Sequence, residues 1–162
     1  MKKFRLATVA AAGALATAAA ILTPASAQAA PSYWTFKNWE FHTCLTAGDS
    51  GSAYATSCSD SARQQWDWVG SDHFQLLKNR KTGKCLTSDG KSDATNGQNS
   101  VWTTDCDKAI GWHYGGDTRW LQNNVGDWDH GFLRTSDVRD AVYTSGKNQV
   151  GPDYYKWTGT VL

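Results

Sequence analysis

Three aromatic residues and a set of aspartates recur along the chain in the same order. The aromatics are Tyr54, Trp102 and Tyr143. One or two aspartates lie a short distance before each aromatic. They are Asp49 before Tyr54, Asp89 or Asp93 before Trp102, and Asp137 or Asp140 before Tyr143. An aromatic face packs on the apolar C–H face of a pyranose ring, and a carboxylate accepts hydrogen bonds from two sugar hydroxyls at once. A simpler interpretation stays open, in which the aromatics cover the side of the protein and the aspartates cap turns.

The second of these groups is the strongest candidate for a sugar site. Trp102 is the largest of the three aromatics, and Asp89 and Asp93 flank the loop before it. The amides of Asn96, Gln98 and Asn99 could add contacts to sugar hydroxyls. Shallow sites bury little area, so we expect single-site affinities of about millimolar to tens of micromolar, with useful strength when several sites act together.

The remaining polar residues form no pattern typical of catalysis or metal binding. The four histidines, His42, His73, His113 and His130, contain no pair at the spacing of metal ligands. No two carboxylates are marked as the acid and base of a glycoside hydrolase. We therefore expect no enzymatic activity, no metal and no cofactor.

The elements that carry these residues come from a threefold repeat. Each copy begins with an apolar residue, then Lys or Gln, then Asn, at residues 36–38, 77–79 and 121–123. A Cys-Leu pair or its substitute follows, as Cys44-Leu45, Cys85-Leu86 and Phe132-Leu133. Each copy ends on a tryptophan, Trp66, Trp112 or Trp157. The period is about 40 to 47 residues, and a unit of this length buries its apolar face only by packing against its copies.

The local sequence is typical of β-strands. Short runs of β-branched and aromatic residues, such as residues 65–69, 74–77 and 100–104, alternate with clusters of Gly, Asn, Asp and Ser. Many short strands at regular spacing predict an all-β barrel or sandwich. Four strands per unit gives about twelve, and we expect the three repeated tryptophans to fill the core.

Residues 1–30 are predicted to be a secretory signal peptide, followed by one domain over residues 31–162. The segment begins with Lys2, Lys3 and Arg5 and continues as an Ala-rich apolar run over residues 6–22. Small residues at the spacing of a cleavage site follow, at residues 25–27 and 27–29. We expect a secreted, extracellular protein without a membrane anchor once the signal is removed.

Removal of this segment changes the balance of charge. The whole chain has 16 basic and 15 acidic residues, and loss of three basic residues leaves 13 against 15. Nucleic acids and anionic membranes require a basic surface. The mature charge therefore argues against either as a partner.

The four cysteines of an exported chain are expected to form disulfide bonds. Four cysteines allow three pairings. The repeat favours pairing within a unit, Cys44 with Cys58 and Cys85 with Cys106, and leaves the third unit without a bridge. The second bridge would hold Trp102 and its loop in a fixed relation, which lowers the ordering cost of binding.

These markers resemble the ricin B-type β-trefoil family, also called the Q-x-W or ricin-type lectin domain, over roughly residues 32–162. Gln64-Gln65-Trp66 carries the motif intact, and residues 110–112 and 155–157 carry degenerate forms of it. Residues 77–86 also resemble the family's most recognisable strand pair. The resemblance implies a β-trefoil of three four-strand units with pseudo-threefold symmetry, within-unit disulfides and one shallow sugar pocket per unit.

The residues at the family's sugar-binding positions differ in every unit. The Asp two residues after the first cysteine is replaced by Thr46, Thr87 and Arg134. The stacking aromatic two residues before the second cysteine is replaced by Thr56, Thr104 and the region of Ser145. The residue before the Q-x-W motif is Arg63, Ala109 or Tyr154. We therefore expect degenerate sites, with sugar contact shifted to Tyr54, Trp102 and Tyr143, which strand alternation places on the same outward face.

Three functions remain in competition. The first is a stand-alone carbohydrate-binding module, supported by the resemblance and the repeated aromatics. The second is a trefoil that binds an extracellular protein, as a hydrolase inhibitor or toxin-like partner, supported by the altered sugar positions. The third is a structural cell-surface or wall protein without a specific ligand. A glycan array separates the first from the others.

Overall fold

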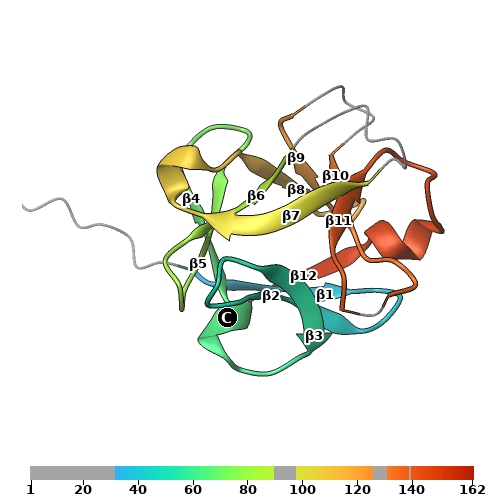
Figure 1. Ribbon diagram of the computed structural model, residues 1–162, viewed down its shortest axis with the longest axis horizontal. Helices are drawn as coiled ribbons and strands as arrows, with labels where there is room; N and C mark the ends of the chain where they lie inside the picture. Colours follow the sequence, from blue (N-terminus) through green and yellow to red (C-terminus); the bar gives the residue numbers. More distant parts are fainter. Residues whose placement is uncertain (1–31, 90–97, 126–130, 139) are drawn as a thin grey trace, which may run out of the picture.

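The computed structural model describes residues 32–89, 98–125, 131–138 and 140–162 (Figure 1). Short antiparallel strands dominate these ranges, as the sequence predicts. The twelve strands are β1 (Trp34–Asn38), β2 (Thr43–Ala47), β3 (Ala53–Ser57), β4 (Trp66–Val69), β5 (Leu76–Asn79), β6 (Cys85–Ser88), β7 (Asn99–Thr104), β8 (Trp112–Gly115), β9 (Trp120–Asn123), β10 (Phe132–Arg134), β11 (Tyr143–Ser145) and β12 (Trp157–Val161). One 3₁₀ turn precedes the last strand of each unit. These turns are η1 (Ala62–Gln64), η2 (Cys106–Lys108) and η3 (Pro152–Tyr155).

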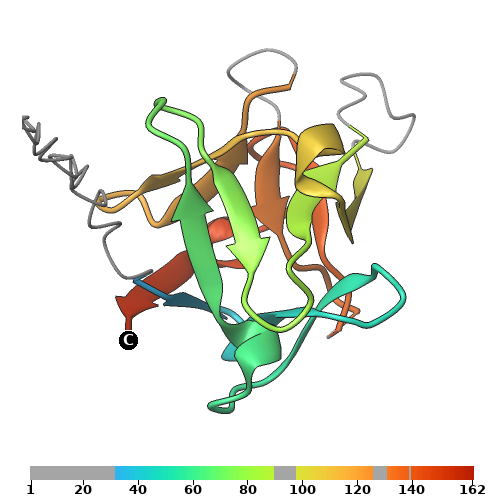
Figure 2. The ribbon, with the colours of Figure 1, turned by 90° about the vertical axis from the view of Figure 1, so that its left-hand side faces the viewer.

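Six strands form a barrel. Strand β1 pairs with β4 and β12, β4 pairs with β5, and β8 pairs with β9. Isolated bridges close the remaining gaps, Gln75 to Trp112 beside β5 and β8, and Trp120 to Lys156 beside β9 and β12. The β1–β12 ladder places the beginning of the described chain beside its end (Figure 1). Turned by 90°, the same barrel shows β4 and β5 side by side, in green (Figure 2).

Three hairpins cover one end of the barrel, and their registers repeat. Strands β2–β3, β6–β7 and β10–β11 pair antiparallel. Thr46 lies opposite Tyr54, Thr87 opposite Trp102, and Arg134 opposite Tyr143. The three hairpins are therefore equivalent in register, and the predicted β-trefoil is confirmed.

The repeated tryptophans join each hairpin to the barrel. Trp66, Trp112 and Trp157 are fully buried, and each indole Nε1 donates to a backbone carbonyl of its own unit's hairpin. The acceptors are the carbonyl oxygens of Leu45 at 3.0 Å, Leu86 at 2.9 Å and Leu133 at 3.0 Å. A buried indole N–H needs such a partner. The prediction that these tryptophans form the core is thus confirmed.

The asparagine of each repeat stabilises the turn after the first strand. The side-chain oxygen of Asn38 accepts from the backbone N–H groups of Glu40 and Phe41. That of Asn79 accepts from Lys81 and Thr82 in the same way. Asparagine suits these sites because its short amide can replace backbone hydrogen bonds in a turn. This explains why Asn ends the first marker in all three units.

The disulfide prediction is also confirmed. Cys44 bonds to Cys58 and Cys85 bonds to Cys106, so all four cysteines are paired within their own units. In the third unit Phe132 takes the place of the first cysteine. Lys147 takes the place of the second, two residues beyond the residue that faces Phe132 across the hairpin.

The signal-peptide prediction concerns residues outside the described part of the chain, which starts at Ser32. It therefore stays a prediction. Within the described ranges, no helix has the length and apolar character needed to cross a membrane.

Candidate functional site

The three predicted aromatics occupy equivalent positions on the hairpins. Tyr54, Trp102 and Tyr143 are all half-buried, and each faces the residue that stands at the family's Asp position. The surroundings of the three side chains differ, because each unit places different side chains at the positions around them.

In unit one, two internal contacts use the groups around Tyr54. Buried Thr46 accepts a hydrogen bond from Gln64 Nε2 at 3.1 Å and donates to the carbonyl of Cys44 at 2.8 Å. Arg63 Nη2 lies 2.6 Å from both carboxylate oxygens of Asp49. The predicted sugar ligand Asp49 is therefore already in an ion pair with Arg63.

In unit three, a buried arginine occupies the pocket. Arg134 is 1% exposed; its Nε donates to Ser145 Oγ at 2.8 Å, and its Nη1 donates to the carbonyl of Thr135 at 2.9 Å. Its guanidinium carbon also lies 5.5 Å from the centre of the Tyr143 ring. Burial lowers the pKa of Arg134 from its ordinary value, and attraction to Tyr155, Tyr143 and Asp137 acts in the opposite direction. This unit thus has a cation where a sugar-binding carboxylate would lie.

Unit two has smaller side chains at the corresponding positions. Thr87 is buried, and its hydroxyl oxygen accepts a long contact from the backbone N–H of Ile110, at 3.4 Å. The equivalent of Arg63 is Ala109, which has no side chain long enough to reach across the site. Trp102 is half-buried and Asp89 is exposed beside it along the hairpin. At the positions of Thr87 and Ala109, unit two therefore has no charged side chain.

The backbone around Trp102 is fixed from both sides. Its strand pairs with β6, and an isolated bridge joins Trp102 to Ser52 of unit one. The N–H of Thr103 donates to the carbonyl of Gly51 at 2.6 Å. A Cβ on Gly51, whose φ is +88°, would lie 3.0 Å from that strand, so glycine is needed there.

The other predicted residues have varied positions. Asp137 and Asp140 are exposed. Asn99 is 5% exposed in β7, and its side-chain oxygen has no hydrogen-bond partner among the described residues. Asp93 and Asn96 lie outside the described residues.

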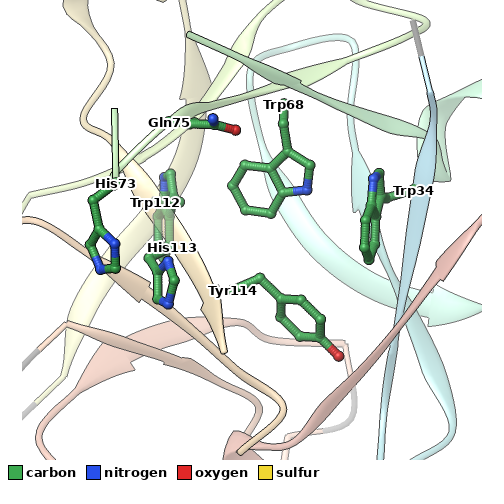
Figure 3. Close-up of a pocket in the computed structure, with 7 residues that line it drawn as sticks. All are labelled: Trp34, Trp68, His73, Gln75, Trp112, His113 and Tyr114. Carbon is green, nitrogen blue, oxygen red and sulfur yellow. The ribbon is translucent and has the colours of Figure 1, made fainter. Parts of the chain in front are cut away.

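An aromatic pocket that the sequence did not predict lies at the other end of the barrel (Figure 3). Its volume is about 330 Å³. Trp34, Trp68 and Tyr114 lie around one side of it, and His73 and His113 stack on the other (Figure 3). Gln75 and the buried Trp112 complete its lining. These residues come from two units, so only their abundance in aromatics could have pointed to the pocket.

No metal site accompanies either location. The described residues contain no group of three or more His, Cys, Asp or Glu side chains able to hold an ion. What the described geometry offers is aromatic faces together with neutral polar groups and aspartates.

Comparison with known proteins places this geometry in a family. The family model described as the ricin-type beta-trefoil lectin domain matches residues 9–127, which is more than half of the chain. The chain therefore belongs to the ricin-type β-trefoil lectin domain family. The matched range ends before β10, although β10 and β11 repeat the register of the other two hairpins. No curated protein matches the chain by sequence.

Solved structures share the fold at low sequence identity. The ricin B-like lectin of Macrolepiota procera, solved in complex with lactose, is 15% identical with a TM-score of 0.62, over 82% of this chain and 97% of that one. The designed threefold-symmetric protein ThreeFoil is 16% identical with a TM-score of 0.63, over 80% of this chain and 99% of that one.

The fold also forms part of an enzyme. The GlcNAcα1-4Gal-releasing endo-β-galactosidase of Clostridium perfringens is 12% identical with a TM-score of 0.62, over 81% of this chain but 32% of that one. At such identities the likeness shows the fold alone. A lectin-like fold is consistent with carbohydrate binding and with a protein that is not an enzyme, and two disulfides are compatible with an extracellular location.

Proposed function

We propose that the protein is a secreted carbohydrate-binding protein without catalytic activity, and that its working hairpin site is in unit two. The observation that carries this proposal is the contrast between the three equivalent hairpins. Arg63 pairs with Asp49 in unit one, and buried Arg134 lies near Tyr143 in unit three. Unit two, by contrast, has only Ala109 and Thr87 at the two corresponding positions. Trp102 would stack on a sugar ring, and Asp89 would accept hydrogen bonds from its hydroxyls.

The surroundings of Trp102 support this proposal. Cys85–Cys106 bonds β6 to the turn η2 that follows β7, and the contact between Thr103 and Gly51 holds β7 against unit one. A site whose backbone is already fixed loses less conformational entropy when a ligand binds. The family membership adds independent support, because lectin domains bind glycans.

Tyr54 with Asp49, and Tyr143 with Asp137, remain weaker sites under this proposal. A sugar at Tyr54 would have to compete with Arg63 for the carboxylate of Asp49. A sugar at Tyr143 would lie beside the Arg134 guanidinium. We therefore assign most of the hairpin affinity to Trp102.

The test is a titration of the secreted protein, with both disulfides formed, against a polysaccharide panel followed by tryptophan fluorescence. We expect Trp102→Ala to weaken polysaccharide binding at least tenfold, because one of several cooperating contacts is lost. Trp39→Ala is the matched control, since Trp39 is 44% exposed and stacks on Arg119 away from the site. Full-strength binding by Trp102→Ala would remove this site from consideration.

One observation favours a second function. Side chains fill the hairpin pockets of units one and three. Such filling is expected in a trefoil that has lost sugar binding and binds an extracellular protein instead. If the unaltered protein binds no member of a broad glycan panel, the protein-binding function is favoured over the carbohydrate-binding one. Capture of one specific extracellular protein by the immobilised chain would then establish it.

A further inference from the structure

The aromatic pocket of Figure 3 shares no lining residue with the three hairpin sites. Strand β1 runs from Trp34 to Asn38, and Asn38 leads into the first hairpin. Trp34 is therefore at the barrel end remote from the hairpins. Trp68 and Tyr114 lie two residues beyond the buried tryptophans that begin β4 and β8, toward that same end.

Three aromatic walls of the pocket rest on one buried ring. Phe36 is fully buried, and its ring centre lies 6.1 Å from that of Trp34, 6.0 Å from that of Trp68 and 5.5 Å from that of Tyr114. The hydroxyl of Tyr114 donates to the carbonyl of Trp157 and accepts from the N–H of Gly159, both at 3.0 Å. The walls are thus held in place before any ligand arrives.

Glycine at position 159 allows the rings of Tyr114 and Trp34 to lie close to the backbone of β12. A Cβ there would lie 3.0 Å from the ring of Tyr114 and 3.1 Å from that of Trp34. Such contacts are tighter than ordinary packing, so a larger residue would push the two rings apart. The pocket depends on the absence of a side chain at this position.

Polar groups line the pocket beside the aromatic faces. Among the described residues, the indole N–H groups of Trp34 and Trp68 and the side-chain amide of Gln75 have no hydrogen-bond partner in the protein. The indoles of Trp66, Trp112 and Trp157, by contrast, each donate to a buried carbonyl. The pocket therefore presents apolar faces together with unused donors and an amide acceptor.

The lining contains no Asp, Glu, Lys or Arg side chain among the described residues. A charged ligand would find no opposite charge there, whereas sugar hydroxyls could bond to an amide, indoles and imidazoles. We infer that this pocket binds a neutral sugar residue, stacked on the aromatic walls and hydrogen-bonded to Gln75. The inference adds a second site to the proposed carbohydrate-binding function and does not involve Trp102.

The pocket continues into a second hollow, which indicates a chain of sugars as its ligand. His73 and His113 stack with ring centres 4.0 Å apart. They also line a neighbouring hollow of about 340 Å³ that extends to Trp120. A glycan that has one residue among Trp34, Trp68 and Tyr114 could therefore extend past the two imidazoles toward Trp120.

The test uses the Trp102→Ala protein, in which the hairpin site is already disabled, and neutral oligosaccharides of increasing length. We expect this variant to bind oligosaccharides, and longer ones more tightly than the corresponding monosaccharides. Adding Trp68→Ala or Gln75→Ala should weaken that binding at least tenfold. Gln149→Ala is the matched control, because Gln149 is an exposed amide outside the pocket. Thermal unfolding shows whether each variant is folded. If Trp68→Ala does not fold, Gln75→Ala still tests the site.

Each outcome separates the two sites. Loss of all saccharide binding on Trp102→Ala alone would overturn the barrel-end site and leave the hairpin site standing. Unchanged oligosaccharide binding in both Trp68→Ala and Gln75→Ala would also overturn it. So would binding of choline in place of sugars, since an aromatic cage can bind a quaternary ammonium group. Oligosaccharide binding that keeps its full strength in Trp102→Ala but is lost with Gln75→Ala would support the barrel-end site and contradict the hairpin site as the main one.

Discussion

The ammonium group of Lys147 lies 5.2 Å from the centre of the Phe132 ring, where the other two units each have a disulfide bond. Phe132 pairs with Ser145 across its hairpin, as Cys44 pairs with Thr56 and Cys85 with Thr104. Cys58, Cys106 and Lys147 each lie two positions after the residue that faces Cys44, Cys85 or Phe132 across the hairpin. Unit three has thus replaced a covalent bond by a cation–π contact and packing.

We predict that Phe132→Cys combined with Lys147→Cys forms a third disulfide bond. The equivalent registers give these positions the same relation across the hairpin as the natural cysteine pairs. Peptide mapping after thiol blocking should find the new bridge. Unfolding in urea should show the oxidised double variant about 3 kcal/mol more stable than its reduced form. Two free thiols in the folded double variant would contradict the equivalence of the units.

Removal of either natural disulfide should destabilise the protein. Replacing both cysteines of one pair by alanine should lower the free energy of unfolding by about 2 to 5 kcal/mol, chiefly because the unfolded chain gains freedom. Urea unfolding of Cys44→Ala with Cys58→Ala, and of Cys85→Ala with Cys106→Ala, measures this. A cross-unit bridge such as Cys58 to Cys85 in the natural protein would reject the assignment.

The three buried indoles should be equally sensitive to loss of their N–H group. Trp66→Phe, Trp112→Phe and Trp157→Phe each remove a donor and leave the carbonyl of Leu45, Leu86 or Leu133 without it. An unsatisfied buried group costs about 1 to 3 kcal/mol, to which the vacated volume adds. Chemical unfolding of the three variants should give similar losses, and a variant as stable as the natural protein would show that its indole bond is not structural.

Gly159→Ala should change the barrel-end pocket selectively. The added methyl group meets Tyr114 and Trp34, so we expect a loss of stability of about 1 to 3 kcal/mol. Near-ultraviolet circular dichroism should also change, because two aromatic rings must move. Gly116→Ala is the control, since a Cβ there meets nothing within 4 Å. Equal stability and equal spectra for the two variants would show that the pocket tolerates a side chain at position 159.

The repeat made the fold predictable, because each unit carries its own strand, turn and core signals. The Asn turns, the buried tryptophans and the disulfides all follow from residues close together within one unit. The register of Tyr54 against Thr46 follows as well, since strand alternation fixes which side chains share a face.

The contents of the pockets were less predictable, because they depend on contacts between distant residues. Nothing in the sequence around Asp49 indicates that Arg63 would form an ion pair with it. The burial of Asn99 likewise results from the packing of β7 against β11. The barrel-end pocket assembles from four segments of two units, so no single stretch of chain carries its pattern.

The most direct test of carbohydrate binding follows all nine indole N–H groups at once. Heteronuclear NMR resolves one indole signal per tryptophan, and Trp→Phe variants assign them. We expect a binding glycan from the panel to shift the signal of Trp102, and those of Trp34 and Trp68 if it also enters the barrel end. The signals of Trp66 and Trp157 should stay in place, because their N–H groups are bonded to buried carbonyls and their rings line neither site. If every glycan of the panel leaves the Trp102 signal unmoved, the hairpin site proposed here is wrong.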